Sequence, residues 1–255
     1  MSSRGLGHRL LPFAGIAIFV TAWHFAVLRS RSGLLPTPWQ TALAIGELAR
    51  KGLLVKYVVA SLFRVTWGYL GALVLAVPTG LLLGLWRRGE VALNPLLQLL
   101  RPISPLAWIP IAILWFGVGD LSAMFLIFLA SFLPLTVTAM HAVHNIEEVH
   151  LRAGINFGLR SRELVREVIF PAILPQLIVG MRITLGIAWL VVVAAEMIAV
   201  NSGLGFLIVD ARNAGNRYDL VVAGMVLIGA IGVGLDALMR SLERIRSVSW
   251  GYATE

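Results

Sequence analysis

Long apolar stretches are the feature that most constrains the fold of this chain. The stretch Val58–Trp86, for example, carries a single charged residue, Arg64. A helix of about 20 apolar residues crosses a hydrocarbon core about 30 Å thick, and several stretches approach that length. Of the 255 residues, 58% are hydrophobic and 13% are charged, which is about half the charged fraction of a soluble domain. The sequence therefore predicts an all-α polytopic membrane protein.

We predict six transmembrane helices and no soluble domain, so that residues 1–255 form a single transmembrane domain. The first apolar stretch follows a short basic segment and has no Ala-x-Ala cleavage site, so we interpret it as an uncleaved span. A shorter helix, from Thr37 or Pro38 to about Lys51, is too short to span and is predicted to lie at the interface. The predicted spans are about Leu10–Leu28, Val58–Trp86, Pro95–Phe116, Leu121–Ala142, Leu177–Val200 and Leu220–Met239.

The distribution of arginine predicts the orientation of these spans. Six spans place both termini on one side of the membrane, and the segments on that side carry more arginine than those on the other. Because cytoplasmic loops are enriched in basic residues, we predict that both termini are cytoplasmic. The segment Arg29–Lys56 is a basic exception on the opposite side. The net charge of +8 is explained by orientation, without a nucleic-acid partner.

Several functions are excluded or disfavoured by what the sequence lacks. There is no cysteine, which excludes disulfides and thiolate metal sites. There is no Gly-x-x-x-x-Gly-Lys-Ser/Thr segment to hold a nucleotide. The five histidines do not form a metal-ligand array, and no Ser-His-Asp arrangement stands out. We therefore expect a chain with no metal site and no catalytic activity of its own.

The segment from His141 to Pro175 is a long polar interruption between two apolar stretches. Leucine, isoleucine and valine recur in it at steps of three to five residues, which predicts amphipathic helix rather than loose linker. An ordered, charged helix between two spans suits a docking surface. The alternative is a solvated loop helix that has no partner.

Part of this segment resembles the cytoplasmic loop of ATP-binding-cassette (ABC) importer permeases. The pattern of that loop is Glu-Ala-Ala, three residues, Gly, nine residues, then Ile-x-Leu-Pro. Ala153, Gly158 and Pro171 match it, Gly154 stands at the second alanine, and Val168 and Phe170 stand at the isoleucine and the leucine. Arg152 stands where the family has glutamate, which is a departure from the pattern.

The sequence after the loop sharpens the resemblance. The segments Leu-Pro-Gln-Leu-Ile-Val-Gly-Met-Arg-Ile, Ala-Ala-Glu-Met-Ile and Asn-Ser-Gly-Leu-Gly-Phe, with the terminal Trp-Gly-Tyr, resemble the nitrate, sulfonate and taurine branch of these permeases. The resemblance covers nearly the whole chain. It implies the architecture of a type I ABC importer permease, in the bacterial cytoplasmic (inner) membrane.

The resemblance also implies a function and a set of partners. Two copies of the chain would form the pathway for a small anion, such as a sulfonate, taurine or nitrate, which a periplasmic or surface-tethered solute-binding protein delivers. Two ATPase subunits, which bind ATP and Mg²⁺, would dock on the loop at residues 143–175, and this chain would carry no cofactor. The loop residues implied in this coupling are Arg152, Ala153, Gly154, Gly158, Arg160, Arg162 and Pro171.

The loop is expected to act as a rigid lever. Gly158 would permit a turn or a close approach at the end of the lever. Pro171 and Pro175 would stop the loop helix from merging with the fifth span. The alternative to an ABC permease is a secondary transporter or channel that needs no ATPase, although the chain shows no convincing internal repeat.

Charged residues within the spans are candidates for the pathway, because a charge in hydrocarbon is expensive. Arg64 and Arg101 are expected near span ends, where long side chains reach water. Arg182 and Glu196 lie 14 residues apart, about 21 Å along a helix, so each needs another partner. For Glu196, a structural hydrogen bond to a neighbouring helix and a role in the pathway are equally compatible with the sequence.

Two further features of the spans concern an aromatic residue and a charged pair. Trp189 is a third candidate for the pathway, although a large aromatic residue on a span more often packs in the core or faces lipid. Asp236 and Arg240 are spaced to form a pair within one helix.

Overall fold

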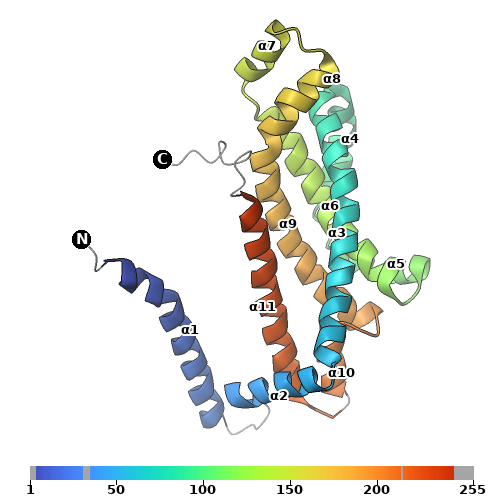
Figure 1. Cartoon of the computed structure of the whole chain (residues 1–255). Helices are drawn as coiled ribbons and strands as arrows, with labels where there is room; N and C mark the ends of the chain where they lie inside the picture. Colours follow the sequence, from blue (N-terminus) through green and yellow to red (C-terminus); the bar gives the residue numbers. More distant parts are fainter. Residues whose placement is uncertain (1–3, 31–34, 214, 244–255) are drawn as a thin grey trace.

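The computed structural model describes residues 4–30, 35–213 and 215–243, and every regular element in these ranges is helical. The long helices after the first lie side by side, whereas the first helix stands apart from them, as Figure 1 shows. The elements are α1 (Arg4–Arg29), α2 (Pro38–Arg50), α3 (Leu53–Leu85), α4 (Arg87–Leu100), η1 (Pro105–Trp108), α5 (Ile109–Phe116), α6 (Asp120–His144), α7 (Glu148–Asn156), α8 (Ser161–Leu164), η2 (Val165–Ile169), α9 (Phe170–Ala199), α10 (Leu204–Asn213) and α11 (Tyr218–Glu243).

Four of the described helices are long and apolar enough to cross a membrane: Leu53–Leu85, Asp120–His144, Ser161–Ala199 and Tyr218–Leu242. A fifth span is present if the bent pair formed by α4 and Pro105–Phe116 counts as one. The apolar part of α1, Phe13–Arg29, is shorter than these spans. The all-α membrane architecture is confirmed, whereas the count of six spans is not.

The prediction of one continuous third span, Pro95–Phe116, was wrong. The chain turns through 85° between α4 and Pro105–Phe116. Pro102 and Pro105 explain the break, because a proline removes a helical hydrogen bond and disfavours helical geometry in the residue before it. The Ser104 hydroxyl then caps the new turn by accepting from the Leu106 N–H.

Helix α6 lies at the centre of the bundle, with α3 along one side and α9 along another. Close approach depends on small residues, since packing drives helix association in lipid. A Cβ added at Gly80 of α3 would lie 2.5 Å from the Cβ of Ala139, and one added at Gly180 of α9 would lie 2.4 Å from the Thr138 side chain. The two glycines therefore let α3 and α9 press directly against α6.

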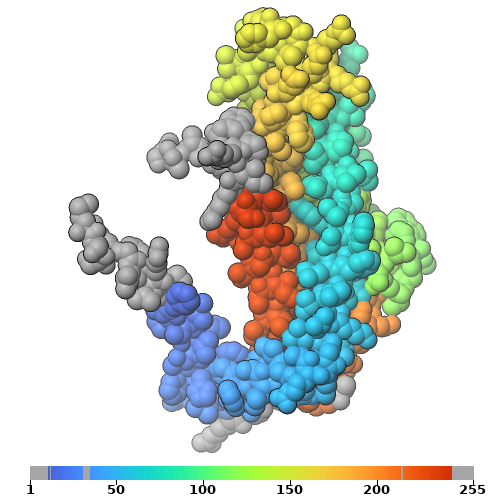
Figure 2. Space-filling view, viewed as in Figure 1, coloured from blue at the N-terminus to red at the C-terminus, as the bar shows by residue number. Residues whose placement is uncertain are grey.

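The short helix predicted between about Thr37 and Lys51 is confirmed as α2, which crosses one end of the bundle (Figure 1). Thr37 begins it with a capping box. The Gln40 N–H donates to the Thr37 hydroxyl at 3.3 Å, and the Thr37 N–H donates to the Gln40 side chain at 2.8 Å. Helices α7 and α8 (yellow) cover the opposite end, as Figure 2 shows.

The prediction that Pro171 and Pro175 separate the loop helix from the fifth span was wrong. Residues Ser161–Ala199 form one helix of 39 residues. The segment Val165–Ile169 is a π-helix, in which the Phe170 N–H bonds to the Val165 carbonyl five residues back. A π-turn widens the helix, and this relieves the clash that a proline ring otherwise makes with the preceding turn.

Candidate functional site

The loop that resembles the ABC coupling segment folds into a short helix, a turn and the first part of the long helix Ser161–Ala199. Helix α7 lies at the end of the molecule opposite α2 (Figure 1). After α7 the Gly158 N–H bonds to the Ile155 carbonyl at 2.9 Å and the Leu159 N–H bonds to the Gly154 carbonyl at 3.2 Å. These two bonds form a Schellman motif, which satisfies the last carbonyls of a helix.

The two glycines of the loop have different tasks. Gly158 has a φ of +81° and open space around it, so it provides the left-handed turn rather than a close contact. Gly154 is buried, and a Cβ there would lie 2.6 Å from the Leu164 side chain. Gly154 therefore allows α7 to pack closely against α8. The sequence predicts either a turn or a close approach at Gly158, and the structure shows the turn there and the close approach at Gly154.

The inner face of α7 is held by apolar contacts. Leu151 and Leu164 pack against a cluster of buried residues from α6, η2 and α9, whose members are Ala142, Val143, Ile169 and Ile173. This cluster attaches the loop to the end of the bundle. Packed side chains therefore connect α7 to the start of α9.

The outer face of α7 combines exposed apolar and charged side chains. Val149, Ile155 and Phe157 are exposed, and Phe157 is 87% accessible. The guanidinium of Arg152 donates to Glu148 at 2.7 Å, one helical turn away. Ala153, Arg160 and Arg162 are also exposed. Pro171 is partly buried near the start of α9, away from this face.

The structure reveals a buried ion-pair cluster at the other end of α9. The guanidinium of Arg64 donates to Glu196 at 2.6 Å, and the exposed fractions of the two side chains are 2% and 0%. Arg64 Nε also donates to Asp120 at 2.8 Å. Ser61 Oγ and the Gly205 N–H donate to the other oxygen of Glu196 at 2.8 and 3.0 Å. The cluster joins α3, α6, α9 and the start of α10.

The expectation that Arg64 reaches water near a span end was therefore wrong. Its charge is compensated within the protein, as buried charges require. The segment Asn-Ser-Gly-Leu-Gly-Phe explains how the cluster is closed. Gly203 has a φ of +106°, and a Cβ there would lie 2.3 Å from the Glu196 carboxylate. Because glycine stands there, the turn after α9 can lie directly on the carboxylate.

Arg182 and Trp189 bind other partners. Arg182 Nε donates to Asp236 at 2.6 Å, and Arg240 donates to the other oxygen of Asp236 at 2.9 Å. The expected pair within α11 is thus confirmed, and α9 is joined to it. Trp189 is buried, and its Nε1 donates to the Ile228 carbonyl of α11 at 3.1 Å. The three candidates Arg182, Trp189 and Glu196 therefore do not converge on one cavity within the chain.

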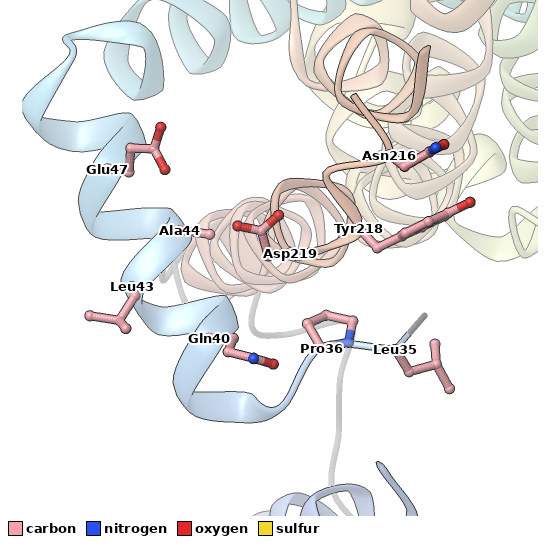
Figure 3. Close-up of a pocket in the computed structure, with 9 residues that line it drawn as sticks. All are labelled: Leu35, Pro36, Gln40, Leu43, Ala44, Glu47, Asn216, Tyr218 and Asp219. Atoms are coloured by element: carbon pink, nitrogen blue, oxygen red, sulfur yellow. The ribbon is translucent and has the colours of Figure 1, made fainter. Parts of the chain in front are cut away.

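A pocket of about 350 Å³ lies beside α2, between this helix and the start of α11. Figure 3 shows Glu47 and Asp219 on its walls. Arg217 donates to Glu47 at 2.7 Å and to Asp219 at 2.8 Å, so it holds both carboxylates. The hydrogen bond from Arg217 lowers the pKa of Glu47 from 4.5 to about 2. These contacts fasten α2 to α11.

The described residues contain no group of three or more His, Asp or Glu side chains placed to hold a metal ion. The terminal Trp-Gly-Tyr segment lies outside the described residues. The described residues instead show an exposed loop surface at one end and ion pairs that join helices.

Comparisons with known proteins agree with the loop and the fold. The family profile "Binding-protein-dependent transport system inner membrane component" matches residues 76–247. A taurine transport permease of Escherichia coli is 34% identical over 94% of this chain and 89% of its own length. An aliphatic sulfonates permease of Bacillus subtilis is 34% identical over 96% and 88%.

More distant similarity extends to other transport systems. A bicarbonate transport permease of Synechococcus elongatus is 32% identical over 92% of this chain and 88% of its own length. A chain of the MetNI methionine ABC transporter, in an inward-facing conformation, shares the fold with a TM-score of 0.61, over 75% of this chain and 97% of its own, at 20% identity. The chain belongs to the family of binding-protein-dependent transport system inner membrane components, and it is the membrane-spanning permease subunit of an ABC importer, with ATP hydrolysis on a separate subunit.

Proposed function

We propose that two copies of this chain form the translocation pathway for a small anion in a complex with two ATPase subunits and a solute-binding protein. The substrates for which three relatives are named, taurine, aliphatic sulfonates and bicarbonate, support this substrate class. Each of these compounds carries a sulfonate or carbonate oxyanion. The family accounts for the ATPase and the binding protein as partners.

The outer face of α7 is the proposed docking site for the ATPase. The main observation in support is that this face exposes apolar side chains. Phe157, Val149 and Ile155 are all exposed, on or directly after α7 at one end of the molecule. Partner-binding helices typically present such apolar anchors with charged neighbours. Residues 143–175 constitute the coupling loop, and Arg152, Ala153, Arg160 and Arg162 supply exposed contacts on it.

Coupling is proposed to follow the continuous helix from the loop into the membrane. Gly154 seats α7 on α8, Gly158 forms the turn, and Pro171 lies in the helix that follows. The 39 residues of Ser161–Ala199 extend for about 58 Å, which is longer than the hydrocarbon core. When the ATPases close, a push on α7 would tilt this helix and open the pathway toward the outside.

The coupling loop and both termini are proposed to be cytoplasmic, in agreement with the positive-inside rule. The directions of the described helices support this. Helix α1 runs toward α2, whereas α11 runs away from it (Figure 1). The pocket beside α2 and the cluster around Arg64 are then at the external side.

The decisive experiment is purification of the tagged chain from its native membranes in a mild detergent, with mass measurement of the intact complex. The expected species contains two copies of this chain and two ATPase subunits. A chain that purifies alone and moves solute down an ion gradient would overturn the proposal.

A pair of variants at Gly158 tests the loop separately. Gly158→Val places a β-branched side chain at positive φ, which is strongly disfavoured, whereas asparagine tolerates this geometry. Gly158→Val is expected to reduce ATP-dependent uptake much more than Gly158→Asn, at equal abundance in the membrane. Equal uptake by the two variants would show that the turn at Gly158 is not needed for coupling.

A further inference from the structure

A second cavity, of about 440 Å³, lies beside the middle parts of two long apolar helices. It is bounded by the bend after α4 and by helices α6 and α9. Two of its lining residues, Pro134 and Thr184, fall near the middle of the 25-residue α6 and of the 30-residue α9. This volume is in the range of pockets that bind small organic molecules.

Arg101 is the one charged residue among the described residues that line this cavity. It ends α4 at the position where the chain bends. Arg101 lies 14 residues after Arg87, about 21 Å along a helix. That distance is greater than the length of an arginine side chain, so Arg101 does not reach the start of α4. Arg101 is exposed in the single chain and lies on the wall of the cavity. Arg101 directly follows the last residue of α4, so the expectation that it lies near a span end stays a prediction.

The carboxylates of the neighbouring spans do not neutralise Arg101. Three carboxylates of these spans bind other arginines: Asp120 of α6 and Glu196 of α9 bind Arg64, and Asp236 of α11 binds Arg182 and Arg240. No described residue forms an ion pair with Arg101. A charge at this depth needs a water-filled cavity or a counter-ion, and the cavity provides space for both.

The walls of the cavity favour an anion that has a small apolar part. Leu133, Ile183 and Ile187 supply apolar surface, which lowers the local dielectric constant and strengthens the attraction between opposite charges. The hydroxyls of Thr138 and Thr184 already donate to the carbonyls of Pro134 and Gly180 in their own helices. The guanidinium, with its fork of N–H donors, is thus the group best suited to bind two oxygens of a sulfonate, carboxylate or carbonate.

We propose that Arg101 contacts the transported anion, and that this cavity is an anion-binding subsite half-way along the pathway. The inference rests on the proposed function, because it requires that the chain transports a small anion. It extends that function by naming the residue that binds the charge. A binding protein selects the solute outside the membrane, and Arg101 gives the permease its own preference for negative charge.

The first test measures charge preference in the cavity and does not depend on transport. Because the chain has no cysteine, Ile183→Cys introduces a single thiol on the cavity wall. The assembled complex is treated with two thiol reagents of equal size, a methanethiosulfonate that bears a sulfonate and one that bears a trimethylammonium group. The control is Leu190→Cys, an exposed position on the same helix outside the cavity lining.

The thiol at position 183 is expected to react faster with the anionic reagent than with the cationic one. Adding Arg101→Gln is expected to reduce the ratio of the two rates by about fivefold or more, since a nearby charge focuses ions of opposite sign. The ratio at position 190 is expected to stay unchanged. A ratio at position 183 that does not respond to Arg101→Gln would overturn the proposal.

The second test measures uptake of radiolabelled taurine, methanesulfonate and bicarbonate by the complete complex in proteoliposomes. Arg101→Gln is expected to reduce the uptake rate per assembled complex by about tenfold or more, while Arg101→Lys retains most of it, because charge-assisted hydrogen bonds are the strong ones. Arg88→Gln, at the other end of α4, removes an exposed arginine and is expected to leave uptake unchanged.

The two tests separate failure of the inference from failure of the proposed function. If the unaltered complex transports an anion and Arg101→Gln transports it equally well, the inference is wrong and the proposed function stands. If the unaltered complex transports none of the three anions, the proposed substrate class is wrong. The inference is then wrong as well, even if the thiol reagents show that the cavity prefers anions.

Discussion

The two ends of the helix Ser161–Ala199 are built in different ways. At the α10 end, Glu196 is fully buried and accepts hydrogen bonds from Arg64, Ser61 and the Gly205 N–H. At the other end the helix carries α7, which is held by a small apolar cluster and a close contact at Gly154. The α10 end is held by a buried ion pair, from which water is excluded. The loop end is held by a few apolar side chains.

This difference indicates how one helix can serve as anchor and lever. Removing one partner of a buried ion pair leaves an uncompensated charge, so the anchored end resists separation from α3. Apolar contacts at the loop end are less directional and tolerate small displacements. Arg182, which binds Asp236 of α11, lies between the two ends and is partly exposed. Four predictions test this contrast, beginning with the largest expected effect.

Arg64→Met is expected to have the largest effect on stability, because it leaves Glu196 buried without its cation. Breaking a buried pair in this way destabilises a protein by about 3–5 kcal/mol. The measurement is thermal unfolding of the detergent-purified chain, followed by size-exclusion chromatography. The control is Arg50→Met, which removes an exposed arginine of α2. If the two variants melt at similar temperatures, the cluster is not an anchor.

Gly154→Leu tests the loop end and is expected to have a smaller effect on stability but a large effect on assembly. A Cβ at this position already lies 2.6 Å from the Leu164 side chain, and overpacking of this kind typically destabilises by about 1–3 kcal/mol. Because the apolar cluster is local, we expect α7 to shift while the spans stay folded.

The measurement for Gly154→Leu is the amount of ATPase subunit that copurifies, with the melting temperature recorded in parallel. The matched control is Gly46→Leu, at a glycine of α2 with open space around it. A large loss of melting temperature with normal copurification would reverse the contrast between the two ends.

Arg182→Met is expected to destabilise the chain less than Arg64→Met does. The side chains of Arg182 and Asp236 are 30% and 40% exposed, so solvent weakens their attraction. Salt is expected to reduce the difference in melting temperature between Arg182→Met and the unaltered chain, because exposed charges are screened at about 1 M salt. The corresponding difference for Arg64→Met should not change with salt. An equal salt response of both would contradict the assigned difference in burial.

The smallest effect is expected at the pair of Glu47 and Arg217, which fastens α2. Folding lowers the pKa of Glu47 from 4.5 to about 2, chiefly through the hydrogen bond from Arg217. Its contribution to stability is therefore fully present above about pH 4.5 and is lost as the pH falls toward about 2. The difference in melting temperature between the unaltered chain and Glu47→Gln should be constant above pH 4.5 and decrease below it. A difference that grows on acidification would refute this assignment.

Much of the architecture could be predicted from local sequence. The interfacial helix begins at the capping box of Thr37, and the turn after α7 occurs at Gly158, where positive φ favours glycine. The pair formed by Asp236 and Arg240 follows from their spacing on one helix. The continuous helix through Pro171 was not predictable in the same way, because the π-turn that accommodates the proline depends on how the loop packs.

The candidate sites were less predictable than the helices. Arg64 was expected to reach water near a span end, yet it is buried in an ion-pair cluster. That Arg101 lines a cavity could not be read from its position in the sequence. Glu196 was open to two interpretations, and only its contacts show that it makes a structural bond to α3. The role of Gly154 in close packing was likewise visible only from the position of Leu164.

By itself the sequence determined that the chain enters a membrane, that its spans are helical and that it carries the loop of an importer permease. Hydropathy and backbone hydrogen bonding act over a few turns of one helix, so local sequence suffices for them. Only the tertiary structure decided which charges meet. Arg64 and Glu196 are separated by 132 residues, and their pairing depends on the rotation and register of three packed helices, which no single segment encodes.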